Sequence, residues 1–296
     1  KYFPTGQYGF NWKEDNGISY LEIGSNYEGY NSTATPDQLL QITLSHEYFH
    51  AIQRGYKPNY SLHDVYFLEM SSMWLEDVIV PDGNDYLDGW TDKLLNNPTA
   101  AIDDTGPGYE LALFGHYLSS FLDTKGLDNV KNSTIIREMW ERYGSTSSDA
   151  FNSVKYVLEN GYNISFIETW TDFMSRNLYN GIYENMDNPF YYYIDQSIVD
   201  PILTFTTLLS DSSEFVLELD DESVAIESFR IGSMESLITI DHDAKEFTGR
   251  VAIVSSTKPE LNNLFWGSDT TVEESFNDVE IHFVYGIDGS SITLPI

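Results

Sequence analysis

Apolar positions recur with the spacing of a helix through most of the first 195 residues. One helix is expected to start with Thr35 as a natural N-cap, followed by Pro36 at the first helical position and Gln38 where a capping box requires it. Apolar side chains continue to Ile52, and Gly55 is expected to end this helix. The same pattern predicts further helices at about 61–80, 108–122, 132–143, 148–161 and 165–181.

Short alternating segments near both ends of the chain predict β-strands. Residues 17–26, with the sequence GISYLEIGSN, indicate a half-buried strand followed by a turn. After Pro201 the segments are short, β-branched and separated by turn residues, a pattern typical of an antiparallel sandwich. The predicted fold class is therefore α+β, with a mainly helical domain and a small N-terminal sheet over residues 1–200, followed by an antiparallel β-sandwich domain over residues 201–296.

The net charge of the chain argues against some classes of binding partner. There are 47 acidic residues against 15 lysines and arginines, which gives a net charge of −32. Such a surface repels nucleic acid and anionic membranes, and no apolar run approaches the roughly 20 residues that span a bilayer. The acidity indicates a saline or extracellular setting, with a simply very soluble acidic protein as an equal alternative. Four Asn-X-Ser/Thr sequons fit glycosylation, but a chain rich in Asn, Ser and Thr contains a few by chance. The absence of cysteine excludes disulfides and thiolate metal sites.

The segment LSHEYFHAIQRGY, residues 44–56, carries the candidate chemistry. Positions i and i+4 of a helix share one face, so His46 and His50 can direct two imidazole nitrogens at one point, with Glu47 beside it. Zinc chemistry uses two such nitrogens together with a nearby carboxylate that takes a proton from water. The alternative is a core helix whose histidines pack against aromatic residues such as Tyr48 and Phe49.

A catalytic zinc requires a third protein ligand, and the next predicted helix offers one. Glu69 follows His50 after eighteen residues and stands among apolar residues, where a carboxylate is costly unless it is paired or bound to metal. Glu76, seven residues further along the same face, is the alternative candidate for the third ligand. His63 and Asp64, at the start of the helix, are weaker candidates.

The motif HEYFH, followed by eighteen residues and Glu69, resembles the gluzincin clan of zinc metallopeptidases, which includes the thermolysin-like enzymes. The wider pattern, SHEYFHAIQRGY and then FLEMSSMWLEDVIVPDGNDYL, is similar to a poorly characterised group of secreted microbial metallopeptidases over about residues 17–145. The resemblance implies a zincin-like catalytic domain that binds Zn²⁺ and hydrolyses a peptide or protein substrate. It implies His46, His50 and Glu69 as ligands and Glu47 as general base.

The same resemblance implies a strand and a hydrogen-bond donor beside the metal. A strand is expected to line the cleft, with SYLEIG at 19–24 as the candidate. Tyr109 or His116 is expected to donate a hydrogen bond to the substrate oxygen, and Tyr109 is the first choice because a loop ending in Gly-Pro-Gly delivers it at the start of a helix. Aromatic packing is an equal alternative for both of these residues. Two positions depart from the family pattern. Met70 replaces a glycine, and Met73 replaces the acid that orients a histidine, so Ser72 or a distant acid is expected to serve instead.

Two further interpretations stay open. The loop DGNDYLD, residues 82–88, has the acidic side chains to hold Ca²⁺ but not the ligand spacing of an EF-hand, and a solvated loop is the alternative. The chief rival to a secreted peptidase is an extracellular structural or adhesive protein on a peptidase scaffold, with the β-sandwich making surface or assembly contacts. A zinc hydrolase that does not cleave proteins is a third hypothesis.

Overall fold

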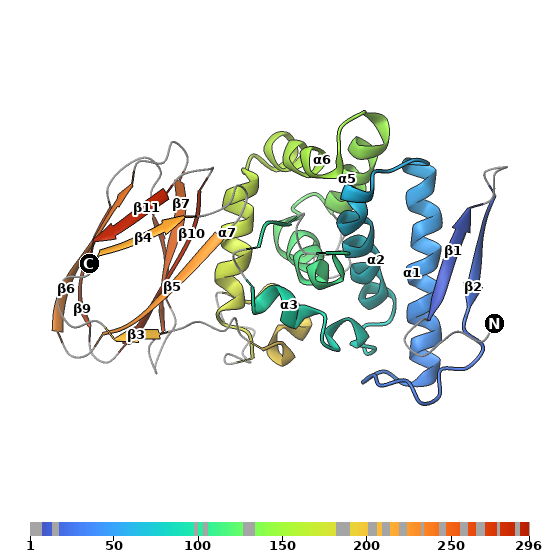
Figure 1. Ribbon diagram of the computed structural model, residues 1–296, viewed down its shortest axis with the longest axis horizontal. Coiled ribbons are helices and arrows are strands. Elements are labelled where there is room, and N and C mark those ends of the chain that lie inside the picture. The colour runs from blue at the N-terminus through green and yellow to red at the C-terminus, as the bar shows by residue number, and fades with distance from the viewer. Residues whose placement is uncertain are drawn as a thin grey trace. The chain divides into compact units, whose positions relative to one another are not determined.

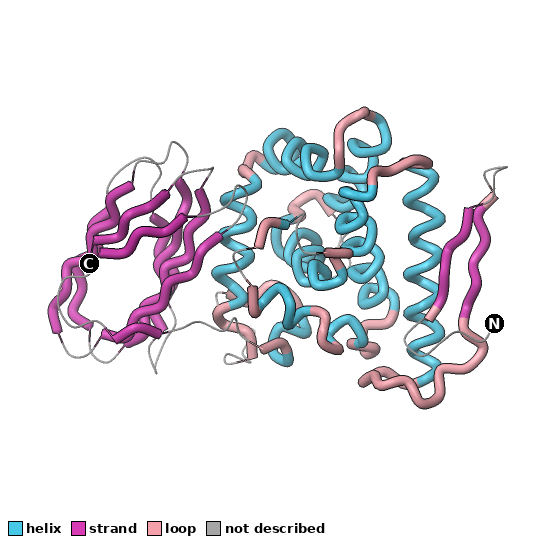
Figure 2. The backbone as a smooth tube through the Cα atoms, in the orientation of Figure 1, coloured by secondary structure: helices cyan, strands magenta, loops and turns pink. Residues whose placement is uncertain are grey.

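The computed structural model describes residues 8–13, 18–97, 100–102, 106–126, 134–181 and 190–200, and the backbone of strands between Thr206 and Pro295. The described residues fall into two compact units, one drawn from residues 1–94, 105–163 and 192–195 and the other from the rest. Up to residue 200 the described chain is mainly helical with a two-stranded sheet near its start, as the sequence predicts (Figures 1 and 2). None of the helices in these ranges is both long and apolar enough to cross a membrane.

The first unit begins with a hairpin packed along a long helix. Strands β1 (Gly9–Lys13) and β2 (Ser19–Ile23) pair in antiparallel register, with Trp12 opposite Tyr20. They lie beside α1 (Pro36–Tyr56), which carries both candidate histidines (Figure 1).

Helix α1 has the start that the sequence predicts and a different end. The capping box is present, because the Thr35 hydroxyl accepts from the Gln38 N–H while the Gln38 side chain accepts from the Thr35 N–H. The prediction that Gly55 ends the helix was wrong. The helix continues to Tyr56, and the Lys57 N–H still donates to the carbonyl of Gln53. Pro58 then follows, and a proline disfavours helical conformation in the residue before it.

Helix α2 forms the centre of the first unit. The hydroxyl of Ser61 caps a 3₁₀ turn, η1 (Leu62–Asp64), which leads directly into α2 (Val65–Ile79). Helix α2 packs against α1 and against α4, and most of its side chains are buried. The remaining elements of this unit are η2 (Asp85–Leu87), α3 (Thr91–Leu95), η4 (Tyr109–Leu111), α4 (Ala112–His116), the π-helical turn η5 (Tyr117–Leu122), α5 (Thr134–Ser145), α6 (Ala150–Val157) and the π-helical turn η6 (Leu158–Tyr162).

Aromatic side chains fill the core behind α2. Trp140 of α5 stacks on Phe67 of α2 with ring centroids 4.7 Å apart, and Tyr143 meets the same phenylalanine edge-on. These rings are almost completely buried, and each aromatic side chain removes a large apolar area from water. The core therefore holds α2 rigidly, and with it the side chains that α2 directs at α1.

The second unit contains α7 (Phe166–Asn177) and the C-terminal strands. A sheet of five strands runs in the order β3 (Thr206–Leu208), β5 (Val224–Ile231), β10 (Val279–Ile287), β7 (Phe247–Val254) and β8 (Glu260–Leu264), and α7 lies along its middle strands. A sheet of four strands runs in the order β4 (Glu214–Glu218), β11 (Ser291–Pro295), β6 (Met234–His242) and β9 (Thr270–Phe276). The packing of these sheets as a sandwich, and the domain boundary near residue 200, stay predictions.

Candidate functional site

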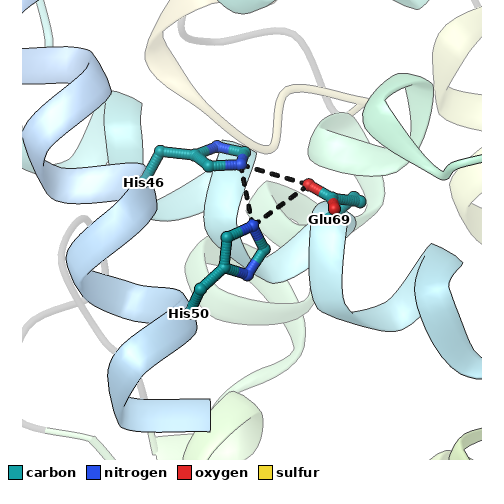
Figure 3. A group of neighbouring side chains, drawn as sticks. All are labelled: His46, His50 and Glu69. Carbon is teal, nitrogen blue, oxygen red and sulfur yellow. Dashed lines mark hydrogen bonds and ion pairs between the residues drawn. The ribbon is translucent and has the colours of Figure 1, made fainter. Parts of the chain in front are cut away.

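Three potential metal ligands converge between α1 and α2. The Nε2 atoms of His46 and His50 lie 3.0 Å apart, and Oε2 of Glu69 lies 3.1 Å from the first and 3.4 Å from the second. Figure 3 shows the two rings and the carboxylate pointing at one another from the two helices. Within the residues that the structure describes, this is the only group of three or more such side chains close enough to share an ion.

The donor set is one that zinc uses, and its spacing is close to that of a tetrahedral site. Two ligands at about 2.0–2.1 Å from a tetrahedral zinc lie about 3.3–3.4 Å from each other, and the three separations here are 3.0–3.4 Å. Two imidazole nitrogens and one carboxylate oxygen form a ligand set that catalytic zinc sites use, with one position left for water or substrate. The side chains are also shielded, with His46 12% and Glu69 15% exposed.

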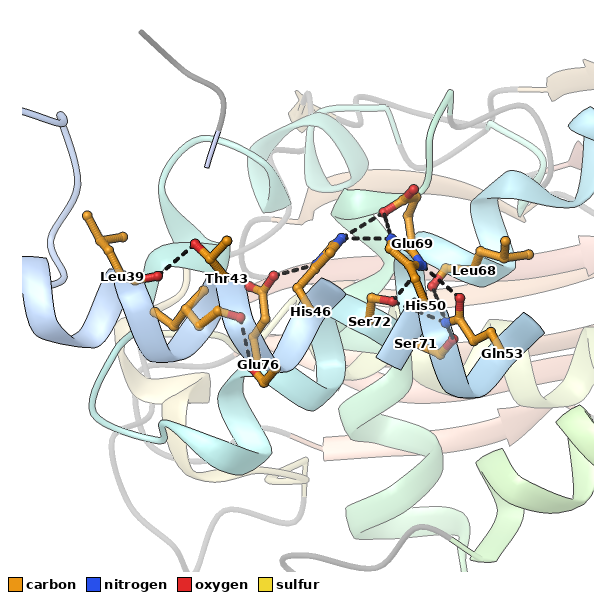
Figure 4. Close-up of polar contacts among 12 residues, drawn as sticks. Leu39, Thr43, His46, His50, Gln53, Leu68, Glu69, Ser71, Ser72 and Glu76 are labelled. Carbon is orange, nitrogen blue, oxygen red and sulfur yellow. Dashed lines mark hydrogen bonds and ion pairs between the residues drawn. The ribbon is translucent and has the colours of Figure 1, made fainter. Parts of the chain in front are cut away.

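Hydrogen bonds fix the orientation of both imidazole rings. Nδ1 of His46 lies 2.5 Å from Oε1 of Glu76, and Nδ1 of His50 lies 2.8 Å from Oε1 of Gln53 (Figure 4). The Gln53 amide nitrogen donates in turn to the carbonyl of Leu68, 2.9 Å away. With each Nδ1–H donated to an oxygen, each Nε2 faces Glu69 and would offer its lone pair to a metal once it carries no proton.

The sequence offers Glu76 as an alternative to Glu69 for the third metal ligand, but the structure places Glu76 elsewhere. It contacts the far nitrogen of His46 and is not one of the three convergent groups. It is the distant acid that the sequence leaves unnamed, and Ser72 contributes only a longer contact of 3.3 Å to Nδ1 of His50. Asp64 accepts from the Tyr143 hydroxyl at 2.7 Å and from the Ala150 N–H at 2.9 Å, away from this cluster.

Charges within the site are strongly coupled. Burial acts to lower the pKa of His46, but the Glu76 and Glu69 carboxylates outweigh it and hold that pKa well above its usual range. Burial acts to raise the pKa of Glu69, yet hydrogen bonds from both histidines bring it down to about 2. Without a metal the cluster is thus an ion pair, and a metal ion binding there would have to displace a proton from His46.

Glu47 stands beside the ligands on the same turn of α1. Its side chain is almost fully buried, and burial raises the pKa of its carboxyl, although the two histidines and a hydrogen bond from the Asn11 backbone oppose this effect. Its position and its raised proton affinity are those that a general base requires.

A cavity of about 450 Å³ opens beside His46 and Glu47. Strand β1 lines it with Gly9 and Phe10, whereas no residue of β2 does, so the expectation that residues 19–24 form the wall was wrong. The physical reason is close approach of β1 to α1, since a Cβ added at Gly9 would lie 3.2 Å from Cγ of Glu47. The sequence could not distinguish the strands, because both alternate.

Tyr109 reaches this cavity, and a glycine places it there. Its ring centroid lies 6.3 Å from that of His46. Gly108, immediately before it, adopts a φ of +92°, and a Cβ at that position would collide with the backbone of Tyr66. Burial, followed by the nearby Glu69 and Glu47 charges, raises the pKa of Tyr109, so the hydroxyl keeps its proton and can donate it in a hydrogen bond.

His116 lies elsewhere. It is 3% exposed, does not line the cavity, and stacks on Tyr193 with ring centroids 4.9 Å apart. Its Nε2 is 3.3 Å from Oδ2 of Asp77, and burial lowers its pKa to about 3. The two candidates for an oxyanion donor are therefore separated, with Tyr109 at the cavity and His116 packed among aromatic side chains.

The two methionines that depart from the family pattern also differ. Met70 is buried and lines no part of the cavity, whereas Met73 forms part of its wall. In the acidic loop, the carboxylates of Asp85 and Asp88 accept hydrogen bonds from residues near the start of α1. Asp85 accepts from the Ser32 hydroxyl at 2.5 Å and Asp88 from the Thr33 N–H at 2.8 Å. Calcium binding by this loop stays a prediction.

Comparison with protein-family models, with curated proteins and with solved structures finds no match for this chain. The chemistry of the site is therefore argued from its own residues and their geometry.

Proposed function

We propose that this chain is a zinc-dependent peptidase. The observation that carries the proposal is the convergence of His46, His50 and Glu69 within 3.4 Å of one another, next to a cavity that His46 and Glu47 line. When bound there, zinc would act as a Lewis acid toward a carbonyl oxygen and lower the pKa of water to about 7.

The residues around the ligands would have separate tasks. The Glu47 carboxylate would accept a proton from the attacking water and pass it to the nitrogen of the leaving amine. The Tyr109 hydroxyl would donate a hydrogen bond to the oxygen on which negative charge develops. Glu76 and Gln53 would hold the two imidazoles in the tautomer and orientation that ligation requires. We place this activity outside the cell, on the strength of the acidity and the sequons.

Chelation and reconstitution test the proposal. The zinc-loaded chain is expected to hydrolyse an unfolded casein, to lose that activity with 1,10-phenanthroline, and to recover it when zinc is restored. Zinc content is measured on each sample. Chelator-insensitive cleavage would contradict the proposal, and a zinc-binding chain that cleaves nothing would favour the structural or adhesive alternative. Hydrolysis of small esters or amides without cleavage of casein would instead identify a zinc hydrolase of another class.

A further inference from the structure

The cavity beside His46 has a chemical character that the proposed hydrolysis does not require. Its wall carries the carboxylates of Asp85 and Asp88, together with that of Glu76 beside His46, and among the residues that the structure describes no lysine or arginine lines it. Aromatic rings form much of the remainder, including Trp90 and Tyr109. The space is therefore both acidic and aromatic.

We propose that this cavity binds the cationic side chain of a lysine or arginine that lies next to the cleaved bond of the substrate. The inference rests on the proposed peptidase function and adds to it a preference for basic residues.

The two loop carboxylates are held in place for such a ligand. Asp85 is buried and fixed by the Ser32 hydroxyl at 2.5 Å. Oδ2 of Asp88 accepts from the Thr33 N–H at 2.8 Å and from the Thr33 hydroxyl at 3.3 Å. Its other oxygen, Oδ1, has no donor among the residues that the structure describes. A cation entering the cavity thus meets a preorganised acceptor and loses little entropy in ordering it.

The carboxylates also repel one another when no cation is present. Burial raises the pKa of the Asp85 carboxyl, and the Asp88 charge adds to that effect. Burial together with the charges of Asp85 and Asp88 likewise raises the pKa of the Tyr8 hydroxyl, which lines the same space. An ammonium or guanidinium group would relieve this unfavourable arrangement.

Trp90, which lines the cavity, also contacts a cation on a residue that is not part of the cavity wall. The Lys93 ammonium lies 4.3 Å from the centroid of the Trp90 ring, and Tyr109 meets the same tryptophan edge-on with centroids 4.8 Å apart. Aromatic faces attract cations and also pack against the methylene stem of a long basic side chain.

Other side chains fit less well. An acidic side chain would face the carboxylates of Asp85 and Asp88, and an apolar one would remove these carboxylates from water without offering them a partner. The discrimination therefore comes from repulsion and desolvation as well as from attraction.

Peptide binding tests the inference without requiring turnover. Zinc-loaded Glu47→Gln protein is titrated, at about 150 mM salt, into fluorescent peptides that differ at one position, with lysine, norleucine or glutamate. Fluorescence anisotropy is expected to show the lysine peptide binding about tenfold more tightly than the norleucine peptide. Adding Asp88→Asn should abolish most of this preference. Adding Asp92→Asn, which removes an exposed charge outside the cavity, should leave it intact and controls for the net charge of −32.

The outcomes separate this inference from the proposed function. Equal affinity for the lysine and norleucine peptides, or a preference that survives Asp88→Asn, would overturn the cationic pocket even if the wild type cleaves casein. A preference that depends on Asp88 would support the pocket even if the wild type cleaves nothing, in which case the peptidase proposal alone would fail.

Discussion

Oε1 of Glu76 lies 2.5 Å from Nδ1 of His46, on the opposite side of the ring from the nitrogen that faces Glu69. The ring is thereby held between a carboxylate that orients it and a carboxylate that would share a metal with it. In the proposed zinc site, Glu76 would therefore be a positioning residue rather than a ligand.

Glu76→Gln is expected to weaken zinc binding by about 10–100-fold, the range found when a hydrogen-bond partner of a ligating histidine is lost. The amide can still accept from Nδ1–H but supplies no negative charge. Competition with a chromogenic chelator measures the affinity. Glu141→Gln is the matched control, because Glu141 is an exposed glutamate on α5. An unchanged affinity in Glu76→Gln would show that the 2.5 Å contact does not support the metal.

The buried Asp77–His116 pair is expected to make the chain less stable at alkaline pH. Burial raises the pKa of Asp77 to about 8 and lowers that of His116 to about 3, from ordinary values of 3.8 and 6.5. The folded pair thus keeps one proton up to about pH 8, whereas the unfolded pair has lost both above about 6.5. Because the folded state then binds more protons, stability falls as the pH rises through this window.

Urea denaturation between pH 6 and 9 measures this loss. The wild type is expected to lose up to about 2 kcal/mol of unfolding free energy, since one proton is worth about 1.4 kcal/mol per pH unit. Asp77→Asn, which cannot ionise, should show a flatter profile, and Asp92→Asn should follow the wild type. Parallel profiles for wild type and Asp77→Asn would contradict the assigned protonation.

Two glycine substitutions separate the geometry of the site from the stability of the chain. A Cβ at Gly9 would lie 2.6 Å from Cγ2 of Thr43 and 3.2 Å from Cγ of Glu47, so Gly9→Ala must displace the hairpin or the side chains of Thr43 and Glu47. We expect the rate of casein hydrolysis to fall by about 10–100-fold while zinc content is kept.

Gly55→Ala is the counterpart on the same helix. Gly55 lies inside α1 with no atom within 4 Å of an added Cβ, so alanine is expected to stabilise the chain by about 0.5–1 kcal/mol and to leave the rate unchanged. Thermal unfolding and the casein assay are run on both variants. A fully active Gly9→Ala enzyme would mean that β1 does not fix Glu47.

Local sequence signals were sufficient to predict those features of the site whose geometry depends on a single helix. The capping residues around Thr35 correctly place the start of α1, and the four-residue spacing correctly places His46 and His50 on one face. Glu69 could be predicted as a ligand because a carboxylate among apolar residues is costly unless it is paired or bound to metal. This argument does not depend on the angle at which the two helices cross. Such features depend on covalent spacing and local hydrogen bonds.

The features that sequence reasoning missed depend on packing between distant segments. Glu76 meets His46 because α1 and α2 lie at one particular separation, which no spacing along the chain specifies. His116 is removed from the cavity by contacts with Tyr193, 77 residues later, whereas Tyr109 is directed into it by the left-handed Gly108. Gly-Pro-Gly before Tyr109 was the only local sign of that difference.

Comparison of Glu47→Gln with the wild type tests the central claim most directly. Both proteins are loaded with zinc, their zinc content is measured, and the rate of casein hydrolysis is determined at neutral pH. Because Glu47 is outside the three convergent ligands, we predict one zinc per chain in both and a loss of at least about 10²–10⁴-fold in rate for the variant. Equal rates at equal zinc content would remove Glu47 from the mechanism and contradict the peptidase proposal.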